Sequence, residues 1–210
     1  MNKPIIVIGA GGHAKVVIDT LMQCGSAILG AVDADSNRHG QSVLGIPVIG
    51  NDEEIFKHEK RSVVLINGVG STDISDHRKN IHQQFLSAGY TFQSLIHPSA
   101  TLAHDVKIAD GAQIMAGVVI QPGCIIGTNT IINTRASIDH DCTIGAHCHI
   151  APGAVLGGNI IIGDGCHIGA GTTIIQNTTI NPNVLVGAGA TVLSNIADGS
   201  RVVGTPARNL

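Results

Sequence analysis

The hydrophobic pattern of the chain changes its period near residue 95. Before that point, short apolar runs of strand length alternate with segments in which apolar residues recur at helical spacing. The pattern predicts strands at 5–9, 27–33, 46–50 and 62–68, and helices at 13–24, 52–59 and 75–88. Strands and helices that alternate in this order are typical of a parallel sheet covered by helices, so we expect a Rossmann-like α/β fold here.

From residue 96 the pattern has a period of six. Every sixth residue from Ile96 to Val192 is Ile, Leu or Val, and the residue four places after each of them, up to residue 190, is small except at Ile160. A fixed period of six with one large and one small inward residue is the signature of a parallel β-helix, in which each hexapeptide forms a short strand and a turn. Glycines between these positions are predicted to supply turn conformations that a side chain would oppose, as at Gly127, Gly145, Gly163, Gly169 and Gly187.

This repeat resembles that of the left-handed β-helix, or hexapeptide-repeat, acyltransferases over all of residues 96–195. The resemblance implies a left-handed helix with three hexapeptides, or eighteen residues, in each coil, and it implies a trimer. The spacing by itself fixes neither the handedness nor the number of subunits. We therefore expect two domains, a Rossmann-like one at 1–95 and a left-handed parallel β-helix at 96–210 that ends in a short tail.

Composition agrees with this boundary and excludes several classes of protein. Residues 96–195 contain seven Asp, Glu, Lys or Arg residues, and all four aromatic residues precede residue 93, so the second core consists of small and aliphatic side chains. The formal net charge of −3 gives no reason to expect nucleic acid as a partner. No apolar stretch is long enough to span a membrane, and the apolar start is broken by Gly9–His13 without a cleavage pattern, so we expect a cytoplasmic protein.

The five cysteines are interpreted as reduced thiols. Their number is odd and they contain no C-x-x-C pair, which fits neither a disulfide framework nor a structural zinc site. Four of them occupy the small inward positions of the repeat, where a compact thiol suits a core. These four are Cys124, Cys142, Cys148 and Cys166.

The turn after the first predicted strand is a candidate phosphate site. Gly9–His13 follows a strand and opens a helix, so bare backbone and a helix N-terminus could receive a phosphate. Asp33 ends the next strand, where a carboxylate could accept hydrogen bonds from ribose hydroxyls. Nucleotide binding is favoured over a merely tight turn, and a redox dinucleotide is less favoured because this domain leaves little room for a hydride-transfer site.

His140 is the candidate general base. It lies between Asp139 and Asp141 at a turn of the repeat, so its side chain should point outward. A neighbouring carboxylate favours the imidazolium and fixes the tautomer that leaves the other nitrogen free to accept a proton. With eighteen residues in a coil, Gly158 lies in the adjacent coil, where its backbone N–H could stabilise an oxyanion. A solvated surface histidine is the alternative.

Three segments together resemble the sugar acetyltransferases of the PglD and NeuD type: GAGGHAKVVIDTL near the start, INTRASIDHDCTIGAHCHIAPGAVLGG in the β-helix, and VVGTPAR near the end. The resemblance implies acetyl-coenzyme A as co-substrate, with His140 as general base, Asp141 as its orienting carboxylate and Gly158 as the oxyanion donor. It also implies that His149 and Asn133 contact the acetyl group or the cofactor. The acceptor would be the amine of a nucleotide-linked amino-dideoxy sugar or a hydroxyl of sialic acid.

The same resemblance implies two further sets of ligand contacts. The nucleotide-sugar would be held by Gly9, Ala10, Gly11, Gly12, His13, Asp33 and Asp35. Coenzyme A would be flanked by Gly169, Ala170, Gly171, Gly187, Gly204 and Pro206.

The spacing of the histidines bears on where the site lies. His149 is nine residues, or half a coil, from His140, so one chain would carry them on opposite sides of the β-helix. If both serve one site, that site lies between subunits. His167 is one coil after His149, which raises the possibility of a metal site, but the β-helical carbonic anhydrases use two histidines five residues apart, and the histidines after residue 100 contain no such pair. We expect no metal.

The sequence thus predicts a trimeric acetyltransferase with its active sites between subunits. It would transfer the acetyl group directly to the amine of a UDP- or GDP-linked 4-amino-dideoxy sugar, for bacterial surface glycans or glycoproteins. The alternative within the class is a sialic acid O-acetyltransferase. Two alternatives from other classes are a zinc hydro-lyase on the same helix and a non-enzymatic module that senses nucleotide-sugars.

Overall fold

A computed structural model describes residues 3–71, 73–74 and 76–210. They form two compact units. The first comprises the chain up to Gly70 together with His77–Pro98, and the second comprises Ser71–Asp76 and Ser99–Leu210. The sequence predicted one domain boundary, after residue 95. It did not predict that the segment 71–76 belongs to the same unit as the β-helix.

The first unit is built on a five-stranded sheet with the strand order β3-β4-β2-β1-β5. β1, β2, β4 and β5 run parallel, which confirms the predicted sheet, whereas β3 forms an antiparallel edge with β4 that the pattern did not predict. The strands are β1 (Ile5–Ile8), β2 (Ile28–Val32), β3 (Ser42–Val43), β4 (Ile46–Gly50) and β5 (Val64–Asn67).

An α-helix packs on each face of this sheet. A methyl group added at Gly68 would touch both Val7 of β1 and Ala14 of α1, which places α1 on the face that carries Val7. Ile6 points to the opposite face, because side chains alternate along a strand, and packs there with Phe85 of α2. The helices are α1 (Gly12–Gln23) and α2 (His77–Ser87). No helix in the described ranges is long and apolar enough to cross a membrane.

Two segments of this unit form 3-10 helices. The predicted helix at 52–59 is the shorter η2 (Asp52–Lys57), and η1 (Ser36–Arg38) was not predicted. Only Ile55 of η2 is buried, so the segment has too little apolar surface to stabilise an α-helix through packing. The helix predicted at 75–88 begins at His77, and Ser75 lies outside the described residues.

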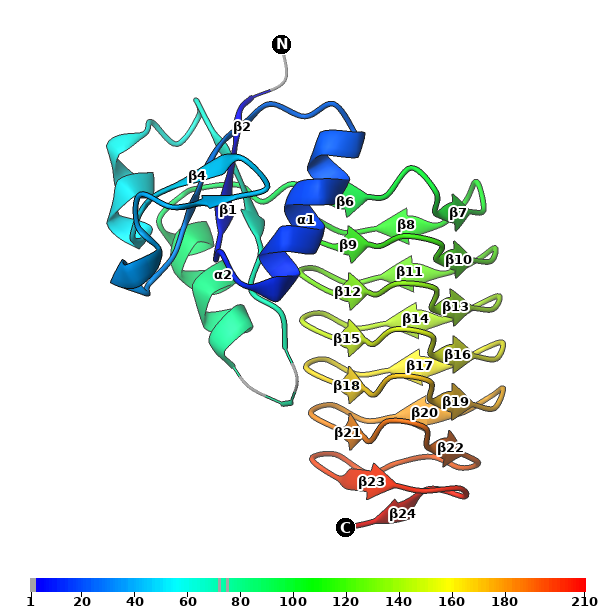
Figure 1. Ribbon diagram of the computed structural model, residues 1–210. Helices are drawn as coiled ribbons and strands as arrows, with labels where there is room; N and C mark the ends of the chain where they lie inside the picture. Colours follow the sequence, from blue (N-terminus) through cyan, green and yellow to red (C-terminus); the bar gives the residue numbers. More distant parts are fainter. Residues whose placement is uncertain (1–2, 72, 75) are drawn as a thin grey trace. The chain divides into compact units, whose positions relative to one another are not determined.

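The second unit is a stack of short parallel strands in three columns (Figure 1). The columns run β7-β10-β13-β16-β19-β22, β8-β11-β14-β17-β20, and β9-β12-β15-β18-β21-β23, with β24 antiparallel to β23 at the end. From β7 to β19, each strand pairs with the strand eighteen residues further on, as Ile120 does with Ile138. This pairing confirms three hexapeptides per coil.

The strands of the repeat are two residues long, apart from β23. In chain order they are β6 (Leu95–Ile96), β7 (Thr101–Leu102), β8 (Lys107–Ile108), β9 (Gln113–Ile114), β10 (Val119–Ile120), β11 (Ile125–Ile126), β12 (Ile131–Ile132), β13 (Ser137–Ile138), β14 (Thr143–Ile144), β15 (His149–Ile150), β16 (Val155–Leu156), β17 (Ile161–Ile162), β18 (His167–Ile168), β19 (Thr173–Ile174), β20 (Thr179–Ile180), β21 (Leu185–Val186), β22 (Thr191–Val192), β23 (Arg201–Val203) and β24 (Arg208–Asn209).

The large residues of the repeat form the core of the β-helix. From Ile114 to Val192 every one of them is at most 1% exposed, as predicted. The prediction was wrong for Ile96, which is 42% exposed while Leu95 is 2% exposed. β6 is the first strand of the repeat, and the large residues of the next two strands, Leu102 and Ile108, are also only partly buried, so the core is complete from Ile114 onward.

The turns repeat with the same period of six. One residue in each turn has a left-handed backbone, which glycine and asparagine adopt with little strain. These residues are Gly111, Gly117, Gly123, Asn129, Arg135, Asp141, His147, Gly153, Asn159, Gly165, Gly171, Asn177, Asn183 and Gly189.

The five glycines singled out in the sequence are not at these left-handed positions, so their predicted role was wrong. The reason for glycine is the close approach of the next coil. A Cβ atom added at Gly127 would lie 2.5 Å from the backbone carbon of Gly145, and one added at Gly169 would lie 2.5 Å from the backbone nitrogen of Ala188. The next coil crowds the remaining three in the same way, namely Gly145, Gly163 and Gly187.

The small inward residues also satisfy polar groups of the backbone. Six of them donate a hydrogen bond, 2.7 to 3.2 Å long, to the carbonyl fifteen residues further on, which belongs to the same corner of the next coil. The six are Cys124, Thr130, Cys142, Cys148, Cys166 and Thr172. The four inward cysteines are buried free thiols, which confirms their interpretation as core residues, whereas Cys24 is exposed.

We expect Gly127→Ala to lower the stability of the protein. The new methyl group would collide with backbone atoms of the next coil, which cannot move independently, and overpacking of this kind costs about 1–3 kcal/mol. The measurement is the melting temperature, with a decrease of about 2–4 °C for each kcal/mol in a chain of this size. The control is Gly199→Asn, because Gly199 has a left-handed backbone with no atom near its Cβ position. Equal stability of Gly127→Ala and wild type would contradict the close contact between coils.

Candidate active site

The side chains of His140 and Asp141 form a pair in the exposed turn between β13 and β14. Nδ1 of His140 lies 2.8 Å from Oδ2 of Asp141. Because a carboxylate only accepts hydrogen bonds, Nδ1 carries the proton, and Nε2 of the neutral ring is free to act as a base. Asp141 has a left-handed backbone, with φ of 60°. Aspartate adopts this conformation more readily than most residues, so the turn itself suits the residue that orients His140.

Two glycines make room for this pair, one in each adjacent coil. Gly158 lies eighteen residues after His140, and a Cβ atom there would be 2.7 Å from both Cε1 and Nε2 of the imidazole. Gly123 lies eighteen residues before Asp141, and a Cβ atom there would be 2.5 Å from Oδ1 of the carboxylate. The backbone N–H of Gly158 donates no hydrogen bond within the described residues, although Gly158 is buried. An unpaired N–H beside a base is an arrangement suited to acyl transfer.

The environment of His140 raises its pKa above the ordinary value of 6.5. The hydrogen bond to Asp141 is the largest cause; partial desolvation opposes it, and the charges of Asp139 and Asp141 add to the increase. The imidazole is therefore a stronger base than a free histidine side chain.

A second polar network lies in the next strand column, around His149 of β15. Nδ1 of His149 donates to the carbonyl oxygen of Ser71 at 2.8 Å, so Nε2 accepts a hydrogen bond from the amide nitrogen of Asn133 at 3.0 Å. The amide oxygen of Asn133 in turn accepts from the backbone N–H of Thr134 at 2.7 Å. These bonds fix His149 as a neutral ring and fix the orientation of the Asn133 amide.

This network explains why the segment at 71–76 belongs to the second unit. Besides the bonds of Ser71, Oδ1 of Asp73 lies 3.3 Å from a guanidinium nitrogen of Arg201. His167 packs edge-on against His149, with 5.0 Å between the ring centroids. Burial lowers the pKa of His167, and the negative charge of Asp73 acts in the opposite direction. Ser71 and Asp73 are thus held by residues of β15 and β23, two strands of one column.

The two predicted parts of the active site therefore lie at different corners of the β-helix. Asn133 and His149 come together, as expected, but their mutual hydrogen bond occupies Nε2 of His149. The group that Asn133 can still offer to a ligand is the second N–H of its amide. In the part of the chain that the structure describes, no group of three or more His, Cys, Asp or Glu side chains could hold a metal ion.

The structure places the predicted coenzyme A residues along one corner of the stack. Asn133, Gly169 and Gly187 share this corner, since they are separated by multiples of eighteen residues. The backbone N–H of Thr191 donates to the carbonyl of Gly204 at 3.0 Å, which joins the C-terminal turn to the same corner. That turn also contains Pro206. Ala170 is held in the stack by the N–H of Gly189 at 2.8 Å, and Gly171 has a left-handed backbone with open space beside it.

In the first unit, the glycine-rich turn is built as the sequence predicts. Gly9 has φ of 96° and follows β1, while Gly11 is the N-cap of α1 and offers no side-chain cap. No atom lies within 4 Å of the Cβ position of Gly11 or Gly12. The free N-terminus of α1 is therefore accessible to an anion. His13 follows within the first turn of the helix, against Gly70.

Asp33 has a different immediate role from the one expected. Its carboxylate accepts hydrogen bonds from the backbone N–H groups of Ala10, at 2.6 Å, and Asp35, at 2.9 Å. Arg38 donates to the carbonyl of Ala10 at 2.8 Å and lies 3.6 Å from Asp35. Asp33 thus joins the first loop to the second, and its two carboxylate oxygens keep further lone pairs.

Two cavities open beside this pair of loops. One has a volume of 310 Å³ and includes Asp33, Asp52 and His77 in its lining. Burial raises the pKa of Asp52, and the charge of Asp33 raises it further while His77 lowers it. The other has a volume of 240 Å³ and includes Lys15 and Arg38. The first cavity is thus acidic and suits donor groups, whereas the second is basic.

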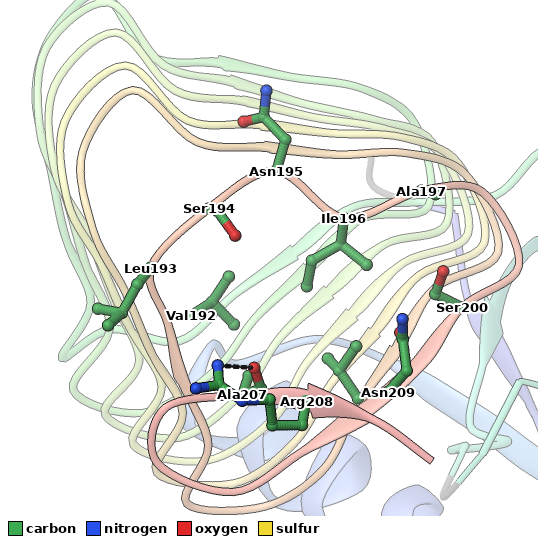
Figure 2. A pocket seen from close by; sticks show the side chains of 11 residues that line it. Val192, Leu193, Ser194, Asn195, Ile196, Ala197, Ser200, Ala207, Arg208 and Asn209 are labelled. Carbon is green, nitrogen blue, oxygen red and sulfur yellow. Dashed lines mark hydrogen bonds between the residues drawn. The ribbon is translucent and has the colours of Figure 1, made fainter.

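A further cavity lies at the C-terminal end of the β-helix (Figure 2). It measures 310 Å³, with Val192 and Ile196 among its apolar residues and Arg208 and Asn209 at its edge. None of the residues of the two networks lines it. It marks the place where the last coil has no further coil to cover its core.

Comparisons with known proteins agree with this arrangement. Residues 4–85 match the family model of the PglD N-terminal domain, and residues 105–140, 123–158 and 159–194 match that of the bacterial transferase hexapeptide repeat. A variant of GDP-perosamine N-acetyltransferase from Caulobacter crescentus, solved with CoA and GDP-perosamine, is 35% identical, with a TM-score of 0.92 and coverage of 99% of this chain and 96% of that one. The chain belongs to the PglD family of sugar N-acetyltransferases.

Two other structures extend this comparison. The acetyltransferase domain of PglB from Neisseria gonorrhoeae, in complex with acetyl coenzyme A, is 37% identical, with a TM-score of 0.92 and full coverage of both chains. WeeI from Acinetobacter baumannii shares the fold at 24% identity and a TM-score of 0.89. The expected family and fold class are thus confirmed, and the protein is an acetyltransferase with acetyl-coenzyme A as its co-substrate.

Sequence reasoning missed three contributors to the sites of this PglD-family enzyme. Gly123 could have been found by counting eighteen residues back from Asp141. Ser71 and Asp73 could not, because they lie outside the repeat and nothing in their spacing connects them to His149.

We expect Asp141→Asn to lower the pKa of His140. The substitution removes the hydrogen-bonded carboxylate that stabilises the imidazolium. The rising limb of kcat/KM against pH should move to lower pH, because His140 must be neutral to act as a base, and the plateau should fall because the base is weaker. The pKa itself can be followed by NMR of the imidazole. A limb that stays in place would show that Asp141 does not control the titration of His140.

We expect Gly158→Ala to reduce activity without unfolding the protein. The methyl group would meet only the end of the His140 side chain, which is exposed and can swing away, so the melting temperature should change little. The displaced imidazole would no longer lie over the N–H of residue 158, and kcat should fall by about tenfold or more. Full activity in this variant would contradict the stacked geometry.

Proposed function

We propose that this enzyme transfers the acetyl group of acetyl-coenzyme A to the amine of a nucleotide-linked amino-dideoxy sugar, with His140 as the general base. The observation that supports this most directly is the position of Nε2 of His140 over Gly158, whose N–H is unpaired within the described residues. The structure from Caulobacter crescentus, with CoA and GDP-perosamine bound, supports a nucleotide-sugar as the acceptor.

The proposed reaction is a direct transfer. The amine nitrogen attacks the thioester carbonyl carbon, a C–N bond forms, and Nε2 of His140 takes the proton that the nitrogen loses. The C–S bond then breaks, and the thiolate of coenzyme A leaves and is protonated by the imidazolium. The N–H of Gly158 would donate to the carbonyl oxygen while that oxygen carries negative charge, an interaction whose loss typically costs about 10²- to 10³-fold in rate.

A covalent acetyl-enzyme has no suitable nucleophile at this corner. Cys142 is two residues from His140, but its side chain points into the core, and burial raises its pKa to about 11. Its thiol therefore stays protonated near neutral pH, whereas the thiolate is the reactive form.

The first unit would bind the nucleotide. The free N-terminus of α1 at Gly11 and Gly12 suits the phosphate next to the nucleoside, and the acidic cavity beside it suits donor groups of the base or ribose. The unpaired oxygen lone pairs of Asp33 and the carboxylate of Asp52 are its strongest acceptors. Asp35 lies at the second loop, where its side chain caps η1.

We further propose a trimer with each active site between two subunits. His140 and the residues Asn133, Gly169 and Gly187 lie at different corners of the coil. One chain cannot bring them together, so a neighbouring subunit would supply the coenzyme A corner.

The experiment is an assay of thiol release from acetyl-coenzyme A with a panel of acceptors. The panel comprises GDP- and UDP-linked 4-amino-dideoxy sugars, free sialic acid and buffer alone. We expect release only with a nucleotide-linked amine. Release with sialic acid alone would replace this proposal with O-acetylation, and no release with any acceptor would overturn it.

The same assay tests the base. We expect His140→Ala to lower kcat by about 10²- to 10⁴-fold, the usual contribution of a positioned base, and to leave KM for acetyl-coenzyme A within about twofold. The matched control is His104→Ala, which removes another histidine of the β-helix outside both networks. Unchanged turnover in His140→Ala would remove His140 from the mechanism.

A further inference from the structure

The β-helix contains a single permanent cation over most of its length. Arg135 is the only Lys or Arg between residues 108 and 200, a region with five aspartates. Both substrates of the proposed reaction are anionic, because each carries a diphosphate. Within residues 108–200, Arg135 is therefore the one side chain with a permanent positive charge that could compensate a bound phosphate.

The backbone at Arg135 is unusual for its residue type. It has a left-handed conformation with φ of 57°, and the corresponding residues of the neighbouring coils, at intervals of eighteen, are all glycine. These are Gly117, Gly153, Gly171 and Gly189. Arginine is strained in this conformation, whereas glycine is not. Strained backbone conformations of this kind cluster at functional sites.

The side chain of Arg135 has a defined direction and an open end. A Cβ atom added at Gly117 would lie 3.3 Å from Cγ of Arg135, so the aliphatic stem runs along the corner toward the earlier coil. The residue is exposed, and within the described residues its guanidinium makes no hydrogen bond or ion pair. It therefore offers several donors in a planar fork, the geometry that suits phosphate.

The direction of the Arg135 side chain indicates which substrate, coenzyme A or the nucleotide-linked sugar, supplies the phosphate that it would bind. It points away from Gly153, Gly171 and Gly189, along which coenzyme A is expected to run. Asn133, which the resemblance places at the acetyl group, is in the same turn. In a nucleotide-sugar the second phosphate is bonded to the sugar itself, so a sugar amine that reaches the active site brings this phosphate with it.

We propose that Arg135 binds the sugar-side phosphate of the nucleotide-linked acceptor and thereby makes the enzyme specific for nucleotide-linked rather than free sugars. This inference rests on the proposed function. Arg38 is a poorer candidate because its charge is already compensated by Asp33 and Asp35.

The test is direct binding of GDP, UDP and CoA by calorimetry to the wild type and three variants. Arg135→Asn removes the charge but keeps a residue that accepts the left-handed turn, as Asn129 and Asn159 do in other turns. Arg135→Lys keeps the charge. Lys107→Gln is the matched control, because it removes the same charge from another face of the β-helix.

We expect Arg135→Asn to weaken binding of the preferred nucleoside diphosphate by about 10- to 100-fold, the usual effect of losing a charged hydrogen bond, with CoA unchanged within twofold. Arg135→Lys should recover most of the affinity at low salt, and Lys107→Gln should resemble wild type. The melting temperature of Arg135→Asn should not fall. In the acetylation assay the same variant should show a raised KM for the acceptor with kcat little changed.

Three results would overturn the inference: unchanged nucleotide affinity in Arg135→Asn, a loss confined to CoA, or an equal loss in Lys107→Gln. A loss in Lys15→Gln with none in Arg135→Asn would assign the phosphate to the first unit instead. Failure of the proposed function is distinguishable, since it appears in the wild type as absence of thiol release with any nucleotide-linked amine.

Discussion

The contact between successive coils of the β-helix is the interaction on which the rest of the structure depends. Each coil lies against the next at the spacing of paired strands, about 4.8 Å, and every inward Ile or Val of one coil covers that of the next. A fully buried side chain of this size contributes about 1.5–3 kcal/mol relative to an exposed one. The column is continuous, so the register of one coil fixes the register of all others.

This register also builds the candidate active site. His140 lies over Gly158 and Asp141 lies against Gly123 because both pairs are eighteen residues apart. No long loop or mobile segment is needed to bring these groups together. A base, its orienting carboxylate and an unpaired N–H are held on a rigid scaffold, as pre-organised acyl transfer requires.

The same spacing explains which residue types the coils tolerate. Where the next coil approaches most closely only glycine fits, and where the backbone is left-handed glycine or asparagine is usual. Inward cysteine and threonine are favoured because their hydrogen bonds reach turn carbonyls in the same corner of the next coil. Asp141, Arg135 and His147 depart from the usual choice at the left-handed position, and we assign chemistry to the first two.

The sequence by itself determined the β-helix, the order of strands and helices before it, and the pairing of His140 with Asp141. These features follow from local periodicity: hydrophobic residues at a fixed interval specify the stack, and adjacent residues in one turn need no long-range information. Only the tertiary structure decided that Ser71 holds His149, that Asp33 fastens the first loop, and that Gly127 is required by the next coil rather than by its own turn. Each of these contacts joins residues that are far apart in the sequence, and a periodic pattern of residue types does not predict which of them lie in contact.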